Sequence, residues 1–274
     1  MVFFQTRTLI VKSVLTIIFT FGSLLTATLA HAGCNRSYSI SYSSKYIPYQ
    51  YSNPYNMPAG LDIDIYEAVM REMGCKYSLN LMPSKRAQVQ LKKGALDMMA
   101  AASITEERQV YANFSIPYRN EKVVMFVRTE NLDKYQSYNL KKAVDNELRI
   151  TAGLGGWYGA EYGEQKERAL EKGALSLNTS PAIRMNQLLD GRTDLVVADL
   201  YVGYHHVINA GRINAVTTLP HILNSDPVHF MLSKSSVSAA EVNLFNQALA
   251  RVLISERYQD LLAKYRPRVN TPTN

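Results

Sequence analysis

The stretch Asp97-Met-Met-Ala-Ala-Ala-Ser-Ile-Thr-Glu-Glu-Arg108, followed by Phe114-Ser-Ile-Pro-Tyr118, decides the fold of this 274-residue chain. Its first half is apolar and small, which is typical of a buried strand that ends near Ser103. The polar second half predicts a helix, so the turn between them directs free backbone N–H groups and the positive end of a helix dipole at one spot. That spot suits a carboxylate, which the Arg108 guanidinium is able to hold with two parallel hydrogen bonds.

The same residues have a second interpretation that involves no ligand. A capped helix whose exposed Arg108 pairs with a neighbouring glutamate would produce the same pattern. Surface Arg–Glu pairs and helix caps are both common, so composition by itself favours this structural interpretation. The choice between the two depends on the rest of the chain.

Short extended runs alternate with helical ones on both sides of this stretch, which predicts an α/β architecture with largely parallel sheets. The clearest helix runs from Asp62 to Gly74, where apolar residues recur at helical spacing and glycine ends the pattern. We expect strands at 37–42, 77–82, 97–101, 123–127, 148–152, 174–177, 195–198 and 215–218, and helices at 62–74, 84–93, 158–171, 181–190, 200–209, 242–252 and 261–265.

The length and the hydrophobic fraction of 47% suffice for one large core or two modest ones. Repeats, low-complexity segments and an obvious linker are all missing from the sequence. We therefore expect two lobes joined by two ordered hinge crossings, near Arg119–Lys122 and Asn224–Val228. The expected boundaries are 33–120 plus 228–267 for the first lobe, 121–227 for the second, and a disordered tail at 268–274.

Residues 1–32 have the pattern of a cleaved signal peptide. Arg7 and Lys12 precede an uncharged apolar run from Val14 to Leu29, and Ala30-His31-Ala32 has the small-x-small form of a signal peptidase site. An uncleaved membrane anchor is the alternative, because the run approaches the length that spans a bilayer. The small residues at its end favour cleavage, so we expect a chain exported to the periplasm.

The two cysteines, Cys34 and Cys75, predict one disulfide in an oxidising compartment, which would tie down the N-terminal strand. The alternative is a lipoprotein acylated at Cys34. His31 argues against it, because a lipoprotein signal normally has Leu or a similar apolar residue three positions before the cysteine.

Several classes of function are not supported by the sequence. The formal charge of +7 falls to +5 without Arg7 and Lys12 and is spread without a dense basic block, which indicates solubility and not nucleic-acid binding. His205 and His206 would point to different faces of a helix, so they do not predict a metal pair. Neither a P-loop, a zinc spacing nor a nucleophile elbow follows the signal segment, and we expect no cofactor.

The stretch 97–118 resembles the core motif of the bacterial extracellular solute-binding proteins of family 3, periplasmic proteins that bind polar amino acids such as histidine, arginine and glutamine. The resemblance implies a two-lobed fold of the periplasmic-binding-protein type II. It also implies that Arg108 binds the α-carboxylate of the ligand together with a backbone N–H at Ser103, and we expect Ala101 beside them to contact the ligand.

Further matches extend over nearly the whole chain. Tyr46-Ile-Pro-Tyr49 is similar to an aromatic segment of the family that covers the ligand, which implies contacts from Tyr46 and Tyr49. Gly60–Asp64 resembles the entry to the first helix. Asp194–Asp199 resembles a strand end at which the last aspartate binds the ligand ammonium, although Asp199 would also serve as a simple cap for the next helix.

The chain departs from the family pattern at two places. Gly153–Gly159 stands where the family often has a Gly-Thr-Thr or Gly-Ser-Thr turn, so only backbone donors at Gly156 and Trp157 are expected to hold the carboxylate there. The loss of the hydroxyls puts a strict α-amino-acid ligand in doubt. Arg86 is the second departure, and it either faces the cleft or, as charged helix faces usually do, the solvent.

These observations predict a monomeric, non-enzymatic binding protein that captures an amino acid or similar small zwitterion and delivers it to an ABC permease in the inner membrane. An enzyme on the same fold, similar to periplasmic cyclohexadienyl dehydratase, is the alternative, with Glu161 as the nearest candidate acid or base, although we expect Glu161 on the outer face of its helix. A sensor module is a third hypothesis, which the sequence up to Asn274 does not favour, since it shows no second apolar span.

Overall fold

The computed structural model describes residue 34 and residues 36–266. The predicted signal peptide at 1–32 and the predicted tail at 268–274 lie outside these residues. No helix within the described residues combines the length and the apolar character needed to cross a membrane.

The first sheet has the strand order β5-β1-β6-β14-β7, and β8 pairs with β14 beside it. β1 pairs in parallel with β5 and β6, whereas β14 runs antiparallel to β6, β7 and β8. The bounds of these strands are Ser37–Tyr42 for β1, Lys76–Leu81 for β5, Met98–Ala102 for β6, Ala112–Phe114 for β7, Arg119–Asn120 for β8 and Pro227–Ser233 for β14.

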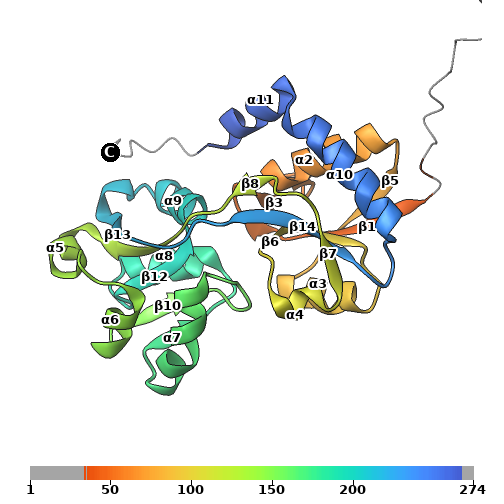
Figure 1. The fold of residues 1–274 in the computed structure, drawn as a ribbon. Helices are drawn as coiled ribbons and strands as arrows, with labels where there is room; N and C mark the ends of the chain where they lie inside the picture. The colour runs from red at the N-terminus through yellow and green to blue at the C-terminus, as the bar shows by residue number, and fades with distance from the viewer. Residues whose placement is uncertain (1–33, 35, 267–274) are drawn as a thin grey trace, which may run out of the picture. The chain divides into compact units, whose positions relative to one another are not determined.

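Helices cover both faces of the first sheet (Figure 1). α2, α10 and α11 lie on one side, and α3 and α4 lie on the other. Tyr66 of α2 and Phe245 of α10 pack around Phe230 of β14, with ring centroids 5.3 and 5.4 Å from it. The bounds of these helices are Leu61–Met73 for α2, Ser84–Lys92 for α3, Glu106–Gln109 for α4, Ala239–Leu253 for α10 and Glu256–Tyr265 for α11.

The second sheet has the order β11-β10-β12-β9-β13. β10 pairs in parallel with β11 and β12, and β9 runs antiparallel to β12 and β13. The strand bounds are Val123–Arg128 for β9, Ile150–Ala152 for β10, Leu175–Leu177 for β11, Leu195–Asp199 for β12 and Val216–Asn224 for β13. The helices that follow its strands are α5 (Leu132–Tyr135), α6 (Leu140–Asp145), α7 (Ala160–Glu171), α8 (Pro181–Leu189) and α9 (Leu200–Asn209), with short 3-10 turns η1 (Thr129–Asn131) and η2 (Ile213–Ala215).

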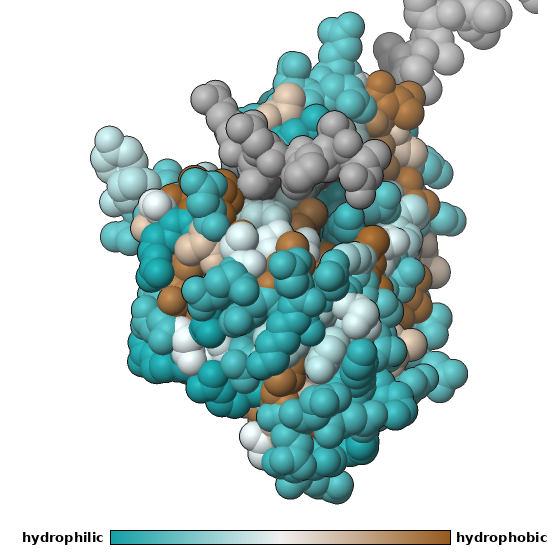
Figure 2. Space-filling view, turned by 90° about the vertical axis from the view of Figure 1, so that its left-hand side faces the viewer, coloured by the Kyte–Doolittle hydropathy of each residue, from teal (hydrophilic) through white to brown (hydrophobic). Residues whose placement is uncertain are grey.

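β9 is buried on both faces, as its continuous apolar sequence predicted. Val123, Met125 and Val127 belong to one hydrophobic cluster, whereas Val124 and Phe126 belong to another. Alternate side chains of a strand point to opposite faces, so helices must cover both sides of this sheet. The solvent-facing surface seen from this side of the molecule is mainly hydrophilic, with apolar residues in small separate patches (Figure 2).

A small three-stranded sheet, β2-β3-β4, lies between β1 and α2, and no strand was expected there. Its strands are β2 (Lys45–Tyr46), β3 (Gln50–Ser52) and β4 (Pro58–Ala59), and Ile47–Pro48 between the first two is a cis peptide. Gly60 follows with φ of 124°, and a Cβ there would lie 2.2 Å from the Tyr49 carbonyl oxygen. Only glycine therefore permits this approach of the β3 entry to the start of α2.

The α/β prediction is confirmed, whereas the expectation of largely parallel sheets is wrong for the strands near the crossings. The chain leaves the first sheet after β8 for β9 and returns from β13 to β14, and β8 and β14 pair with each other. β8 and β14 are antiparallel because the chain leaves the first sheet along β8 and returns to it along β14. No strand is expected at β14 from the sequence, because its apolar residues directly follow the expected crossing at 224–228.

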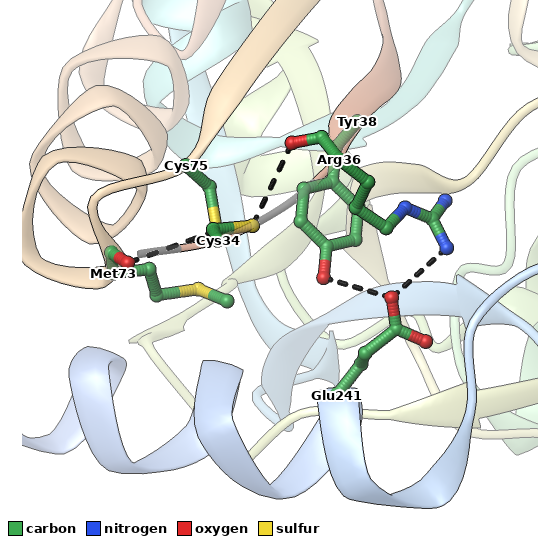
Figure 3. The surroundings of a disulfide bond; sticks show 6 residues. All are labelled: Cys34, Arg36, Tyr38, Met73, Cys75 and Glu241. Atoms are coloured by element: carbon green, nitrogen blue, oxygen red, sulfur yellow. Dashed lines mark hydrogen bonds and ion pairs between the residues drawn. A yellow bond between two sulfur atoms is a disulfide. The ribbon is translucent and has the colours of Figure 1, made fainter. Parts of the chain in front are cut away.

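Cys34 and Cys75 form a disulfide, with a Cα–Cα distance of 4.8 Å (Figure 3). The bond joins the residue before β1 to the turn between α2 and β5. Beside it, Arg36 pairs with Glu241 of α10 and with Asp97, and the Tyr38 hydroxyl donates to the same Glu241 carboxylate at 3.1 Å. The disulfide is the first of the two alternatives predicted for Cys34.

Candidate functional site

A pocket of about 610 Å³ opens between the edges of the two sheets. Its walls come from the carboxyl ends of β1, β5 and β6 on one side and of β10 and β12 on the other, together with the segment that leads into β9. Loops at the carboxyl ends of parallel strands meet at one edge, which is the usual ligand position in α/β folds. Of the residues expected to contact a ligand, those that line it are Tyr46, Ala101, Ser103, Arg108, Gly156, Trp157 and Asp199.

Arg108 lies on the first-sheet wall without a carboxylate partner. One terminal guanidinium nitrogen donates to the Ser103 carbonyl at 2.9 Å, and no ion pair within the described residues includes Arg108. Burial lowers the pKa of its guanidinium. The alternative of an exposed Arg108 paired with glutamate is therefore wrong. The helix expected after Ser103 is only the four residues of α4, capped by the Thr105 hydroxyl, so its dipole is small.

Ala101 is held in a left-handed backbone conformation, with φ of 56°. The register between β6 and β14 shifts between His229 and Met231, which places a bulge at this point of the strand. The Ala101 N–H donates to the Tyr118 hydroxyl at 3.0 Å, so the two ends of the 97–118 motif meet here. A strained non-glycine residue costs about 1–3 kcal/mol and is typically found at a functional site.

Asp199 is the helix cap that the sequence offered as one of its two roles, and it also borders the pocket. One carboxylate oxygen accepts from the backbone N–H groups of Tyr201 and Val202 at 2.9 and 3.0 Å, which caps α9. The other accepts from the Tyr49 hydroxyl at 3.4 Å. Asp199 is only 4% exposed and also lines the pocket, and its burial raises the pKa of the carboxyl above its ordinary value.

Tyr46 and Tyr49 do not have equivalent positions. The Tyr46 side chain lines the pocket, and its hydroxyl donates to Glu121 at 2.7 Å. Tyr49 is buried behind it, outside the pocket lining, with the Arg119 guanidinium 3.6 Å from its ring centroid. Arg119 in turn donates to Asp62 at 2.9 Å, which gives the Gly60–Asp64 motif a structural role beneath the pocket.

Glu121 is a pocket residue that sequence analysis missed. It is buried where the chain enters β9, and it stands next to Asp199 because Val123 and Asp199 are partners in the sheet. Burial, followed by the neighbouring Asp199 charge, raises the pKa of Glu121 to about 7. The only sequence signal was an acidic residue at a predicted crossing, which does not separate it from the exposed Lys122 beside it.

The glycine turn after β10 forms the opposite wall. The Gly153 N–H donates to the Tyr158 hydroxyl at 3.1 Å, and a Cβ at Gly153 would lie 3.2 Å from a terminal nitrogen of Arg184. The aliphatic part of Lys85 lies against Gly155 from the first-sheet side. Lys85 and Arg184 line the pocket although neither was expected to, whereas Arg86 is exposed and lies outside the lining.

Glu161, the nearest candidate acid or base in the sequence, is engaged away from the pocket. One of its oxygens accepts from the Leu140 N–H at 2.8 Å at the start of α6, and the other lies 2.6 Å from His221 Nε2. The described residues also contain no group of three or more His, Cys, Asp or Glu side chains suited to a metal ion.

The sequence model of the bacterial extracellular solute-binding proteins of family 3 matches residues 38–268. Among characterised proteins, the chain is 23% identical over 237 residues to a probable histidine-binding protein of Neisseria gonorrhoeae, a match that covers 85% of this chain and 84% of that protein.

Solved structures with the same fold include a histidine kinase sensor domain with similarity to periplasmic binding proteins, at 20% identity and a TM-score of 0.72 over 84% of this chain and 96% of that one. An ancestral amino acid-binding protein, a precursor of cyclohexadienyl dehydratase, matches at 20% identity and a TM-score of 0.69, over 84% and 95% of the two chains. At these identities the likeness shows the fold, and the two-lobed α/β class predicted from the sequence is confirmed.

Proposed function

Because the chain belongs to the bacterial extracellular solute-binding proteins of family 3, we propose that it captures an amino acid or similar small zwitterion in the pocket between its lobes. The captured solute then passes to an ABC permease of the inner membrane. The signal-peptide pattern of residues 1–32 and the extracellular character of the family support action in the periplasm.

The observation that carries the proposal is the opposition of charges across the pocket. Arg108, on the first-sheet wall, has no carboxylate partner within the described residues, and Asp199, on the second-sheet wall, is a buried carboxylate. A guanidinium recognises a carboxylate and a buried carboxylate favours an ammonium group, so a zwitterion satisfies both. Buried charges that lack partners are costly to the free protein, and binding removes that cost.

The remaining contacts follow from the positions of the side chains around these two charges. Ser103 and Ala101 border the carboxylate next to Arg108, and backbone groups of Gly156 and Trp157 approach it from the other wall. Tyr46 covers the ammonium end, and Tyr49 orients Asp199 from behind. Rotation about the two crossings, near 119–122 and 224–228, closes the lobes over the solute.

The test is a thermal-shift screen of the purified protein against the amino acids, polyamines and aromatic acids. A ligand that binds only the native state raises the melting temperature by mass action. We expect one zwitterion to stabilise the wild type but not Arg108→Ala, whereas Arg212→Ala, an exposed arginine outside the pocket, should respond like the wild type. If no amino-acid-like compound shifts the wild type, or if Arg108→Ala responds normally, the proposal is wrong.

A periplasmic enzyme is the second candidate, and Glu121 is the observation that favours it. A carboxyl with a pKa of about 7 at a ligand pocket has the property required of a general acid or base. The binding function predicts that any bound solute is recovered chemically unchanged. Mass spectrometry of the solute after prolonged incubation distinguishes the two, since conversion that Glu121→Gln abolishes would identify an enzyme.

A further inference from the structure

Arg184 is a buried cation at the pocket that the binding of a simple zwitterion does not use. It is 5% exposed, lies on α8 and lines the pocket beside Gly153. One terminal nitrogen donates to the Asn178 carbonyl, and the buried Nε has no hydrogen-bond partner within the described residues.

Arg184 has no counter-charge in the part of the chain that the structure describes. Among residues 34 and 36–266, no carboxylate forms an ion pair with it. Its titratable neighbour His206 is kept neutral, because burial first, and then the charges of His205 and Arg184, lower the pKa of His206 to about 4. Buried charges are usually paired, so an isolated one at a pocket wall is suited to an anion that arrives from outside.

The order of strands places this cation apart from the carboxylates. Along the pocket edge of the second sheet, Gly153 and Arg184 lie at β10, Asp199 ends β12, and Glu121 precedes β9. Neighbouring strands are about 4.8 Å apart, so the edge runs from a cation to two carboxylates over a distance that one amino acid spans. Lys85 adds a second positive charge on the cation side, because its side chain lies against Gly155.

We propose that Arg184 forms an anion subsite of the second lobe, and that the solute is an amino acid with a carboxylate in its side chain. The inference rests on the proposed function, since Arg108 and Asp199 are taken to hold the zwitterionic group. The side-chain carboxylate then lies against Arg184 beside the glycine turn, where it also meets Lys85.

The charge of the pocket supports this class of solute over a cationic one. Lys45, Lys85, Arg108 and Arg184 contribute four positive charges to the lining, against the carboxyls of Asp199 and Glu121, of which Glu121 is partly protonated near neutral pH. A solute with two carboxylates and one ammonium group complements this excess of positive charge. A cationic side chain, as in histidine or arginine, would leave Arg184 without a partner and place a like charge near it.

Titration calorimetry of the purified protein with L-glutamate, L-aspartate, L-glutamine, L-asparagine, L-arginine and L-histidine tests the inference. We expect an acidic amino acid to bind at least about tenfold more tightly than its amide. Arg184→Met should remove that preference and leave the affinity for the amide nearly unchanged. Arg192→Met, at an exposed arginine of the same lobe, is the matched control and should retain the preference.

The melting temperature of the ligand-free protein distinguishes a ligand-binding role of Arg184 from a purely structural one. Removal of an isolated buried charge should leave its melting temperature unchanged or raise it, and Arg184→Lys, which retains the charge, should keep part of the acid preference. A lowered ligand-free melting temperature with equal loss of acid and amide binding in both variants overturns the inference. Preferred binding of L-arginine or L-histidine that needs Arg108 but not Arg184 overturns it and leaves the proposed function intact. If none of these six amino acids binds, the inference is wrong, and the wider thermal-shift screen decides the proposed function separately.

Discussion

The two lobes differ in how their buried arginines, Arg119 and Arg184, are paired. In the first lobe, Arg119 donates to Asp62 at 2.9 Å and lies over the Tyr49 ring, and the Gln50 amide donates to the second Asp62 oxygen at 2.8 Å. In the second lobe, Arg184 has no carboxylate partner within the described residues. A buried arginine that is paired serves the framework, whereas one left unpaired at a pocket is available to a ligand.

The carboxyl groups of the two lobes also differ in their surroundings. Asp97 in the first lobe accepts from the Ser39 N–H and the Ser236 hydroxyl and pairs with Arg36. At the second-lobe wall, burial raises the pKa of both Asp199 and Glu121, and the nearby Asp199 charge further disfavours the ionisation of Glu121. These two carboxyls lie at the pocket, where a solute that carries an ammonium group would stabilise their ionised forms.

The largest effect on stability should come from removing the carboxylate that pairs with Arg119. Asp62→Ala leaves Arg119 buried without a carboxylate, which should lower the free energy of unfolding by about 3–5 kcal/mol. Urea unfolding measures it, with the exposed Asp133→Ala as control. A loss below about 1 kcal/mol would show that Arg119 is no more dependent on its partner than Arg184.

The disulfide offers the next largest effect on the first lobe. Cys34→Ser with Cys75→Ser opens a loop with a sequence separation of 41, which should reduce the free energy of unfolding by about 3–4 kcal/mol in the chain-entropy model. Ligand affinity, measured in parallel, should change little because neither cysteine lines the pocket. An equal loss of affinity would mean that the first lobe depends on this bond for the geometry of Arg108.

The pH dependence of stability tests the buried charge of the second lobe through Glu121. Its pKa rises from 4.5 to about 7 on folding, so the folded chain holds the proton more tightly than the unfolded chain. The stabilising contribution is complete below about pH 4.5, declines as pH rises toward 7 and is lost above it. Glu121→Gln, which does not ionise, should gain up to about 3 kcal/mol of stability over the wild type at pH 8.

Urea unfolding of Glu121→Gln and of the wild type at pH 5 and pH 8 measures this difference, with the exposed Glu164→Gln as control. Asp199, Asp62, Arg119 and Tyr46 are the charged and titratable groups that act on Glu121, and none is altered by the substitution. If the free energy of unfolding changes with pH by the same amount in the wild type and in Glu121→Gln, the pKa of Glu121 is not raised by folding.

The smallest effect should come from Lys85, an exposed residue that approaches the glycine turn from the first lobe. Exposed charges contribute about 0.2–1 kcal/mol, so Lys85→Met should weaken the binding of an acidic amino acid by about two- to fivefold. Calorimetry at low and high salt should show the difference shrinking as salt is added. Lys93→Met, at an exposed lysine that is the C-cap of the same helix α3 and lies outside the pocket lining, should have no effect.

The sequence predicted the pocket residues best where they follow directly from the end of one strand. Ala101, Ser103 and Arg108 come from a single stretch and all line the pocket, and Asp199 directly ends β12. Arg86 shows the limit, because its neighbour Lys85 lines the pocket instead. One position along a helix rotates a side chain by about 100°, and neither the register of that helix nor its tilt is contained in the pattern.

Glu121 and Arg184 were beyond prediction for a different reason. They are 63 positions apart in the sequence and reach one pocket edge only because β9 inserts beside β12 and α8 packs against these two strands, which lets the Arg184 side chain reach Gly153. Their burial is equally a property of the assembled lobes, since each is polar in the sequence and would be assigned to the surface.

The amino-acid sequence by itself determined the α/β class, the strand and helix turn that begin the 97–118 motif, and the positions of Arg108 after that strand and of Asp199 at the end of another, because periodicity and turn chemistry are local properties. The tertiary structure alone decided the antiparallel strands at the crossings, the division between paired Arg119 and isolated Arg184, and the raised pKa of Glu121. Burial and the distance between charges depend on which distant segments pack together, and these two quantities set the electrostatics of the pocket.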